Sequence, residues 1–203
     1  PQPARVTALP GIDAHSHAPE SHVSTKATPA SRVFSREAWK LLTKNLPEVF
    51  RNPTDIRARS AVQLGAAWAG LAIENAMLGA AHGAANHLTA RYKVAHGQAV
   101  GLMLPHIIRF NGKVAQDQYG DLAAIAGLST DVPEASLADW IHTLLKTTGL
   151  YQSLGDVLGT HTETNEIERL AQEASMQWTS SFNPRPCSSA DFIDLYRRAL
   201  AKA

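Results

Sequence analysis

The sequence contains a single cysteine, Cys187, so no disulfide can form within the chain. Proteins of reducing compartments typically lack disulfides, and this favours a cytoplasmic location. Aromatic residues make up only 6% of the 203 residues, whereas alanine and leucine are abundant. Such small and unbranched side chains are typical of helices that pack closely against one another. We therefore predict one helix-rich domain.

Long charged runs and long apolar runs are also missing. The 19 basic and 18 acidic side chains nearly cancel, and no basic cluster favours a nucleic acid or a membrane as a partner. The longest apolar run, residues 64–73, is about half the ~20 residues that a membrane-spanning helix needs. No signal-peptide pattern opens the chain. Its first residue is Pro1 instead of methionine, so we expect either processing or a fragment of a longer protein.

Helical signals recur along the chain, and no alternating strand pattern interrupts them. One helix is predicted to begin at Ser35 and to stop near Pro47. The segment over residues 54–80 is apolar nearly all round. Because a helix without a polar face belongs in the middle of a bundle, we expect this segment to be the central pillar of the domain. Other helices are predicted to begin near the capping residues Asp131, Asn165 and Ser188.

Nine histidines are a high count for this length, and the first cluster of them includes a carboxylate. Asp13 and His17 are four residues apart and would share one face of a helix, whereas His15 would point elsewhere. A carboxylate and an imidazole on one face can converge on the same metal ion. Taken alone, such a pair more often stabilises the surface of an ordinary helix.

The second cluster contains His82, which lies among glycine and alanine residues, and His96, which precedes a helical segment over residues 99–110. Small neighbours clear space for a close-packed helix or for a metal with its substrate. The dipole at a helix start keeps a histidine neutral, as a metal ligand must be. For either residue alone, a buried core histidine is the alternative. One carboxylate and three imidazoles would suit Fe²⁺, Zn²⁺ or Mn²⁺.

Several motifs resemble those of a known family. Residues 11–20, GIDAHSHAPE, resemble the G-x-D-A-x-x-H-A-x-E signature of iron-containing alcohol dehydrogenases. Residues 75–83, NAMLGAAHG, are similar to the second signature, and residues 96–111 to its continuation. Near the end, residues 183–196 resemble the closing segment of the family. The motifs follow in the family's order, so the resemblance covers nearly the whole chain from residue 11 onward.

This resemblance implies an all-α, multihelical bundle like the C-terminal domain of iron-containing alcohol dehydrogenases and dehydroquinate synthase-like proteins. In such enzymes the metal, here expected to be Fe²⁺ or else Zn²⁺, acts as a Lewis acid without changing its oxidation state. It eases hydride transfer between a small alcohol and NAD or NADP. The resemblance further implies that the metal ligands are the matched residues Asp13, His17, His82 and His96.

Complete members of the family carry an amino-terminal α/β domain with a glycine-rich phosphate-binding loop, and no G-x-G-x-x-G motif follows a strand here. We therefore interpret residues 1–10 as the remnant of a linker from a nucleotide-binding domain, and residues 11–203 as the helical, metal-binding catalytic domain. The chain alone is expected to bind metal but to bind NAD(P) poorly and turn over little. Its expected partners are the nucleotide-binding half, a small alcohol or aldehyde, and further copies in a homo-oligomer.

Many members carry another histidine four residues beyond the third ligand, and it is often assigned to a proton relay. That position here is Asn86. The adjacent His87 would diverge from it by about 100° on a helix, so no residue is assigned as the catalytic acid or base. The other histidines are predicted to be surface or capping residues: His22, His106, His142 and His161. The tryptophans are predicted to lie in the core: Trp39, Trp68, Trp140 and Trp178.

Two alternatives remain at this point. One is a zinc-dependent polyol dehydrogenase similar to glycerol dehydrogenase, whose relatives use one aspartate and two histidines as ligands. The additional His17 favours iron over this alternative, although affinity alone does not, because Zn²⁺ generally outcompetes Fe²⁺ for nitrogen and oxygen ligands. The other alternative is a non-catalytic helical module that stores metal or mediates assembly.

Overall fold

The computed structural model describes residues 2–159 and 164–201. Within these residues every regular element is a helix and no strand occurs, which confirms the predicted all-α fold. The elements are α1 (Ala4–Val23), α2 (Pro29–Arg51), α3 (Ile56–Ala76), α4 (Ala80–Tyr92), α5 (His96–Asn111), α6 (Gln116–Ile125), α7 (Pro133–Thr147), α8 (Leu154–Leu158), α9 (Thr164–Met176), the 3-10 helix η1 (Trp178–Phe182) and α10 (Ser189–Leu200).

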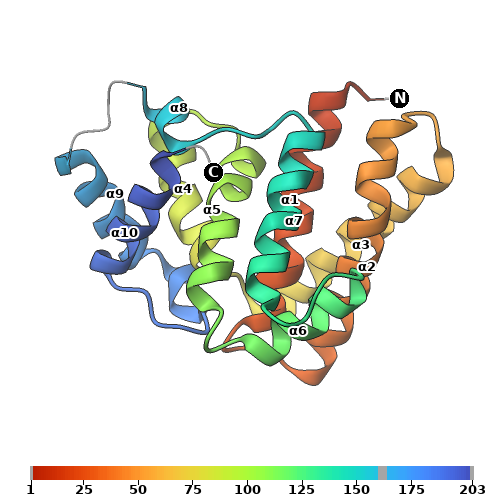
Figure 1. The fold of residues 1–203 in the computed structure, drawn as a ribbon, viewed down its shortest axis with the longest axis horizontal. Coiled ribbons are helices and arrows are strands. Elements are labelled where there is room, and N and C mark those ends of the chain that lie inside the picture. The colour runs from red at the N-terminus through yellow and green to blue at the C-terminus, as the bar shows by residue number, and fades with distance from the viewer. Residues whose placement is uncertain (1, 160–163, 202–203) are drawn as a thin grey trace.

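Helix α5 is the most buried of the long helices and lies inside the bundle. Twelve of its 16 residues are buried, and it packs against α1, α4, α7 and α10. The hairpin of α2 and α3 forms one end of the molecule, and α9 with α10 forms the other (Figure 1). Helix α1 packs against both α5 and the α2–α3 hairpin, so it joins this hairpin to the helices that surround α5.

The prediction that residues 54–80 form the central pillar is wrong. The inner face of α3 buries only small residues, whereas Leu64 is 52% exposed and Leu71 is 46% exposed. The segment lacks charged side chains between residues 60 and 73, but much of its apolar surface faces outward. Absence of charge therefore did not identify the buried helix, and α5 takes the central place.

The predicted boundaries of α2 also differ from those observed. Its N-cap is Thr28, and the side chains of Thr28 and Ser31 each accept a hydrogen bond from the other's backbone N–H. Ser35 lies one turn further on, where its hydroxyl donates to the carbonyl of Arg32. The helix continues through Pro47, which removes one backbone hydrogen bond without ending it. By contrast, the predicted start of α10 is confirmed, because the side chain of Ser188 accepts from the backbone N–H of Asp191.

Residues 4–10, which were expected to be a linker remnant, belong to α1 and run without a break into the turn that carries Asp13. Their role as a junction with another domain stays a prediction. Among the tryptophans, Trp39 is fully buried, but Trp178 is 61% exposed and its assignment to the core is wrong. No helix of the described residues is both long and apolar enough to cross a bilayer.

A close approach of α5 to α1 depends on Gly97. A Cβ atom at this position would lie 2.0 Å from the backbone carbonyl oxygen of Leu9. The approach places His96, the first residue of α5, beside the part of α1 that carries Asp13. On the preceding side, Lys93 ends α4 in the left-handed conformation with φ of 55°. The chain thereby turns so that α4 packs along α5.

We predict that Gly97→Ala lowers the free energy of unfolding by about 1–3 kcal/mol, because the backbone of α1 must move away from the added methyl group. Gly120→Ala in α6 is the matched control, since no atom lies within 4 Å of a Cβ there. The control is expected to raise stability by about 0.5–1 kcal/mol through helix propensity. Chemical denaturation measures both, and equal behaviour of the two variants would contradict the role of Gly97.

Candidate metal centre

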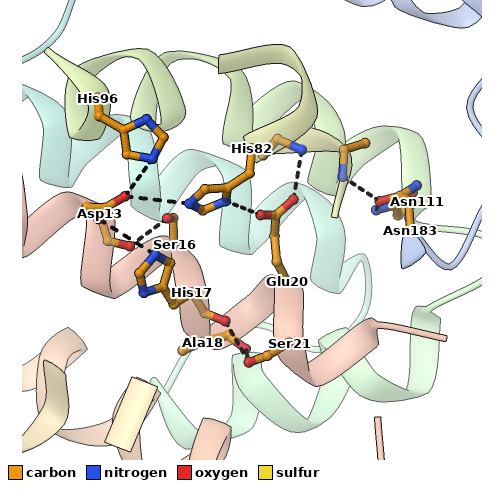
Figure 2. Close-up of polar contacts among 12 residues, drawn as sticks. Asp13, Ser16, His17, Ala18, Glu20, Ser21, His82, His96, Asn111 and Asn183 are labelled. Atoms are coloured by element: carbon orange, nitrogen blue, oxygen red, sulfur yellow. Dashed lines mark hydrogen bonds and ion pairs between the residues drawn. The ribbon is translucent and has the colours of Figure 1, made fainter. Parts of the chain in front are cut away.

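One face of α1 supplies three of the side chains at the centre. Asp13, His17 and Glu20 follow the i, i+4, i+7 spacing of a single helix face. In Figure 2 their side chains point toward the segments that carry His82 and His96. His82 lies in the first turn of α4, and His96 is the first residue of α5. Residues from three helices therefore meet in one place.

The carboxylate of Asp13 is the meeting point. Its Oδ1 atom lies 3.5 Å from Nε2 of His82 and 3.4 Å from Nε2 of His96. Ligand atoms of these three residues all lie within 4.8 Å of one another. His17 stands beside this group of three and is not part of it. Its Nε2 atom lies 3.6 Å from the other carboxylate oxygen of Asp13, and its ring centroid is 5.1 Å from that of His82.

The chemistry of these atoms fits a bound divalent metal. Oδ1 of Asp13 and Nε2 of His82 are buried, and neither has a hydrogen-bond partner among the described residues. A buried polar atom without a partner is costly, and a metal ion would satisfy both atoms. Tetrahedral ligands with bonds of about 2.1 Å lie ~3.4 Å apart, close to the spacing of Asp13 from the two histidines.

Glu20 orients His82 from the opposite side of its ring. The buried carboxylate accepts a short hydrogen bond from Nδ1 of His82, and its second oxygen accepts from the backbone N–H of Ala81 at 2.7 Å. With Nδ1 engaged, Nε2 of His82 faces Asp13 (Figure 2). Such carboxylate–histidine pairs fix the tautomer and the ring orientation of metal ligands. This role of Glu20 was not predicted from the sequence, although its i+7 spacing from Asp13 places it on the same helix face.

The start of α4 is held by side chains from elsewhere in the chain. Its N-cap is Gly79, which has no side chain to accept from the first N–H groups. Besides the bond from Ala81 to Glu20, the N–H of Ala80 donates to Oδ1 of Asn183 at 3.4 Å. The side-chain amides of Asn183 and Asn111 also exchange two hydrogen bonds, of 2.7 and 3.0 Å. These contacts fix the helix turn that presents His82.

The protonation of the centre follows from burial and from the two carboxylates. Burial raises the pKa of Asp13, but the close imidazole rings of His82, His17 and His96 outweigh this and leave the pKa below its ordinary value. Burial lowers the pKa of His17 to about 4 and lowers that of His96 as well. For His82 burial also favours the neutral ring, but Glu20 and Asp13 raise its pKa to about 9.

Most of the other histidines have partners away from the centre. His15 points to the opposite side of α1, as predicted, and its ring stacks on Trp140 at 4.8 Å between centroids. His22 was predicted to be a surface or capping residue, but it is only 2% exposed, and its ring contacts the side chains of Ser35 and Asp121. The surface assignment is therefore wrong. His106 and His142 are half-buried and lie 6.2 Å apart, ring to ring, whereas His161 falls outside the described residues.

His87 does not replace a side chain at the position of Asn86. Its Nδ1 atom lies 3.4 Å from Oε2 of Glu173 on α9, so the ring is turned away from α1. Asn86 itself follows His82 by one helix turn and is partly exposed, which places it on the same face of α4. His87 therefore takes part in the contact between α4 and α9. The uncharged amide of Asn86 occupies the position next to the centre.

The fold and the centre together define an all-helical domain with a candidate metal site of one carboxylate and histidines. The family model for the Fe-containing alcohol dehydrogenase family, C-terminal, matches residues 7–200. The chain belongs to this family and corresponds to its C-terminal domain.

Known members of the family resemble the chain over nearly all of its length. The chain is 30% identical to the 1,3-propanediol dehydrogenase of Citrobacter freundii, over 98% of its own residues and 52% of that protein. It is also 30% identical to the NAD-dependent methanol dehydrogenase of Bacillus methanolicus, over 98% of its residues and 53% of that protein. A crystal structure of 1,3-propanediol oxidoreductase superposes with a TM-score of 0.90 at 28% identity, covering 98% of this chain and 52% of the other. The chain thus spans about half the length of these relatives.

We predict that metal affinity rises between pH 7 and pH 9, by about tenfold per pH unit, because the metal must displace one proton from His82. The same raised pKa stabilises the metal-free fold below pH 6.5, and this contribution is lost as the pH rises through about 9. Competition titrations against a chelator of known affinity at several pH values measure the first effect. A flat profile would contradict the protonated state of His82.

Glu20→Gln is expected to weaken metal binding by about 10- to 100-fold, because an amide orients the ring of His82 less firmly and removes a negative charge. Glu37→Gln is the matched control, since Glu37 lies on α2 and pairs with Lys40 at the surface. Isothermal titration with Zn²⁺ or Co²⁺ compares the two variants with the unchanged chain. Equal affinity in all three proteins would exclude a positioning role for Glu20.

Proposed function

We propose that the chain is the metal-binding catalytic domain of an NAD(P)-dependent, iron-containing alcohol dehydrogenase. The observation that carries this proposal is the meeting of Asp13, His82 and His96, with two buried ligand atoms that have no other partner among the described residues. Membership of the family supports it, and the similar proteins include dehydrogenases of 1,3-propanediol and of methanol. We therefore expect a small alcohol or diol as the substrate and the matching aldehyde as the product.

We assign a separate role to each residue of the proposed centre. Asp13, His82 and His96 would hold the ion, and His17 would be the fourth ligand after a small movement toward it. A divalent metal bound there supplies Lewis acidity for the carbon–oxygen bond of the substrate. Glu20 keeps His82 in place, and the polar, partly exposed Asn86 lies on the side of α4 that faces the centre.

The nucleotide site is proposed to lie outside this chain. The relatives are about twice as long, and no glycine-rich phosphate loop occurs in these residues. We propose that an amino-terminal nucleotide-binding half supplies NAD or NADP, and that the protein works as a cytoplasmic homo-oligomer. Without that half, the chain would bind metal and alcohol but transfer little hydride.

A specific observation also supports the zinc alternative. The three residues that converge are one aspartate and two histidines, and His17 stands outside this group. That set corresponds to the ligands expected for a zinc polyol dehydrogenase. Metal analysis of anaerobically purified protein distinguishes the two proposals. If iron is bound with His17 as a ligand, His17→Ala lowers its affinity; a zinc site of three residues would be little affected.

For the alcohol dehydrogenase function, we predict that the Co²⁺-loaded chain changes its visible absorption when 1,3-propanediol or a short alcohol is added. The reason is that a metal held by Asp13, His82 and His96 would supply Lewis acidity to an alcohol oxygen, and binding of the alcohol beside it would alter the surroundings of the ion. His82→Ala is expected to abolish Co²⁺ binding, whereas His142→Gln, remote from the centre, should leave it unchanged. A spectrum that responds to no alcohol, diol or aldehyde, although Co²⁺ is bound, would favour the non-catalytic module instead.

A further inference from the structure

A cavity of about 390 Å³ lies between the first half of α1 and the α2–α3 hairpin, whose places in the bundle are shown in Figure 1. A smaller hollow of about 80 Å³ adjoins it, because Thr7, Val49 and Arg59 line both spaces. The two lobes together are called the hairpin cavity below. A volume of this order is typical of pockets that hold a small molecule. None of the residues at the candidate metal centre lines either lobe.

Apolar side chains form most of the walls of the hairpin cavity. Val49 of α2 is buried, and it faces both lobes. Val62 and Ala66 of α3 line the larger lobe, and Phe50 with Pro53 lines the smaller one. Among the described residues no carboxylate lines either lobe. These walls favour an apolar body inside the cavity, because such a body leaves water when it binds there.

One cation, Arg59, lines both lobes of the hairpin cavity. Its Nε–H donates to the carbonyl of Pro53 at 2.6 Å, which fixes the direction of the guanidinium. The terminal NH₂ groups have no acceptor, and the side chain pairs with no carboxylate in the described part of the chain. Asp55, one helix turn earlier, accepts instead from the N–H groups of Arg57 and Ala58. A guanidinium held in this way offers two parallel donors to a carboxylate.

The hydroxyl of Thr7 is a second polar anchor of the hairpin cavity. Its Oγ1 atom is buried and has no hydrogen-bond partner among the residues that the structure describes. A helical threonine can donate to a carbonyl one turn earlier, but Thr7 does not. A buried hydroxyl without a partner is unfavourable, and an acceptor inside the cavity would satisfy it. Because Thr7 and Arg59 line both lobes, the two donors lie where the lobes join.

Two donors beside apolar walls select a ligand with one anionic end and one apolar end. A carboxylate would accept from Arg59 and Thr7, and an alkyl chain would extend along Val62 and Ala66 in the larger lobe. If each carbon of the chain takes about the ~30 Å³ of a water molecule, an incompletely filled lobe holds roughly 6–10 carbons. A segment of protein fits less well. Oγ1 of Thr7 is already buried between helices of this chain, so the acceptor must enter the cavity and not merely cover it.

We propose that the hairpin cavity binds a medium-chain monocarboxylate, with its carboxylate held by Arg59 and Thr7 and its chain in the larger lobe. A neutral alcohol of the same length would leave the guanidinium of Arg59 without a counterion. A short carboxylate would leave the apolar walls in contact with water. The site is separate from the metal centre, so its occupation does not depend on the proposed dehydrogenase function.

Isothermal titration of the metal-free chain with sodium octanoate tests the site, since without a metal the carboxylate cannot bind at the centre. We expect a single site with a dissociation constant on the order of 10–100 µM. Octanol and butyrate are each expected to bind about tenfold more weakly or worse. Arg59→Met is expected to weaken octanoate binding by about 10- to 100-fold. Arg57→Met is the matched control, because Arg57 is an exposed neighbour that does not line the cavity.

A second pair of variants tests the place of the alkyl chain. Ala66→Leu fills part of the larger lobe and is expected to weaken octanoate binding by about fivefold or more. Ala67→Leu, on the exposed side of α3, should leave it unchanged. Circular dichroism verifies that each variant keeps its helices. Octanol that binds as tightly as octanoate, or equal affinities within either pair of variants, would overturn the proposal. A chain that binds no octanoate at millimolar concentration would overturn it as well and assign the cavity to a segment of protein.

Discussion

A single carboxylate oxygen, Oδ1 of Asp13, faces imidazole nitrogens from two other helices at 3.4 and 3.5 Å. The rest of the bundle can be understood from what this meeting requires. Helix α5 must come close enough to α1 for His96 to reach the carboxylate, and Gly97 makes that possible. Helix α4 must begin where His82 faces Asp13, and Glu20 with Asn183 holds that beginning. The close backbone contact at Gly97 and the hydrogen bonds of Glu20 and Asn183 thus both help to place the two histidines beside Asp13.

The sequence predicts part of this centre through local geometry. The four-residue spacing of Asp13 and His17 correctly placed both on one face of α1, and it placed His15 on another. Spacing along the chain could not bring His82 and His96 to the same point, since they belong to other helices. That expectation rested on family resemblance. The role of Glu20 was readable from its position seven residues after Asp13, but its partner became visible only with the start of α4.

The errors have a common physical cause. Helix α3 was expected at the centre because it lacks charge, and Trp178 was expected in the core because tryptophan is apolar. Composition shows that a segment is apolar, but it does not show whether other residues of the chain bury that segment. Helix α5 carries Arg109, and the proline Pro105 interrupts its backbone hydrogen bonding, yet it is the buried helix. Glycine and alanine content does not identify the central helix either, because α3 contains more of these two residues together than α5.

The electrostatics of the centre explain how it can exist in a metal-free fold and still favour a metal. Two buried or half-buried carboxylates, Asp13 and Glu20, surround a protonated His82 when no metal is bound. One negative charge is then left without compensation, which is unfavourable in a medium of low dielectric constant. A divalent cation in place of the proton would balance both carboxylates, while burial lowers the pKa values of His17 and His96 and keeps these rings neutral. The proton therefore stabilises the metal-free fold only in part, and its exchange for a divalent metal ion would remove the remaining charge imbalance.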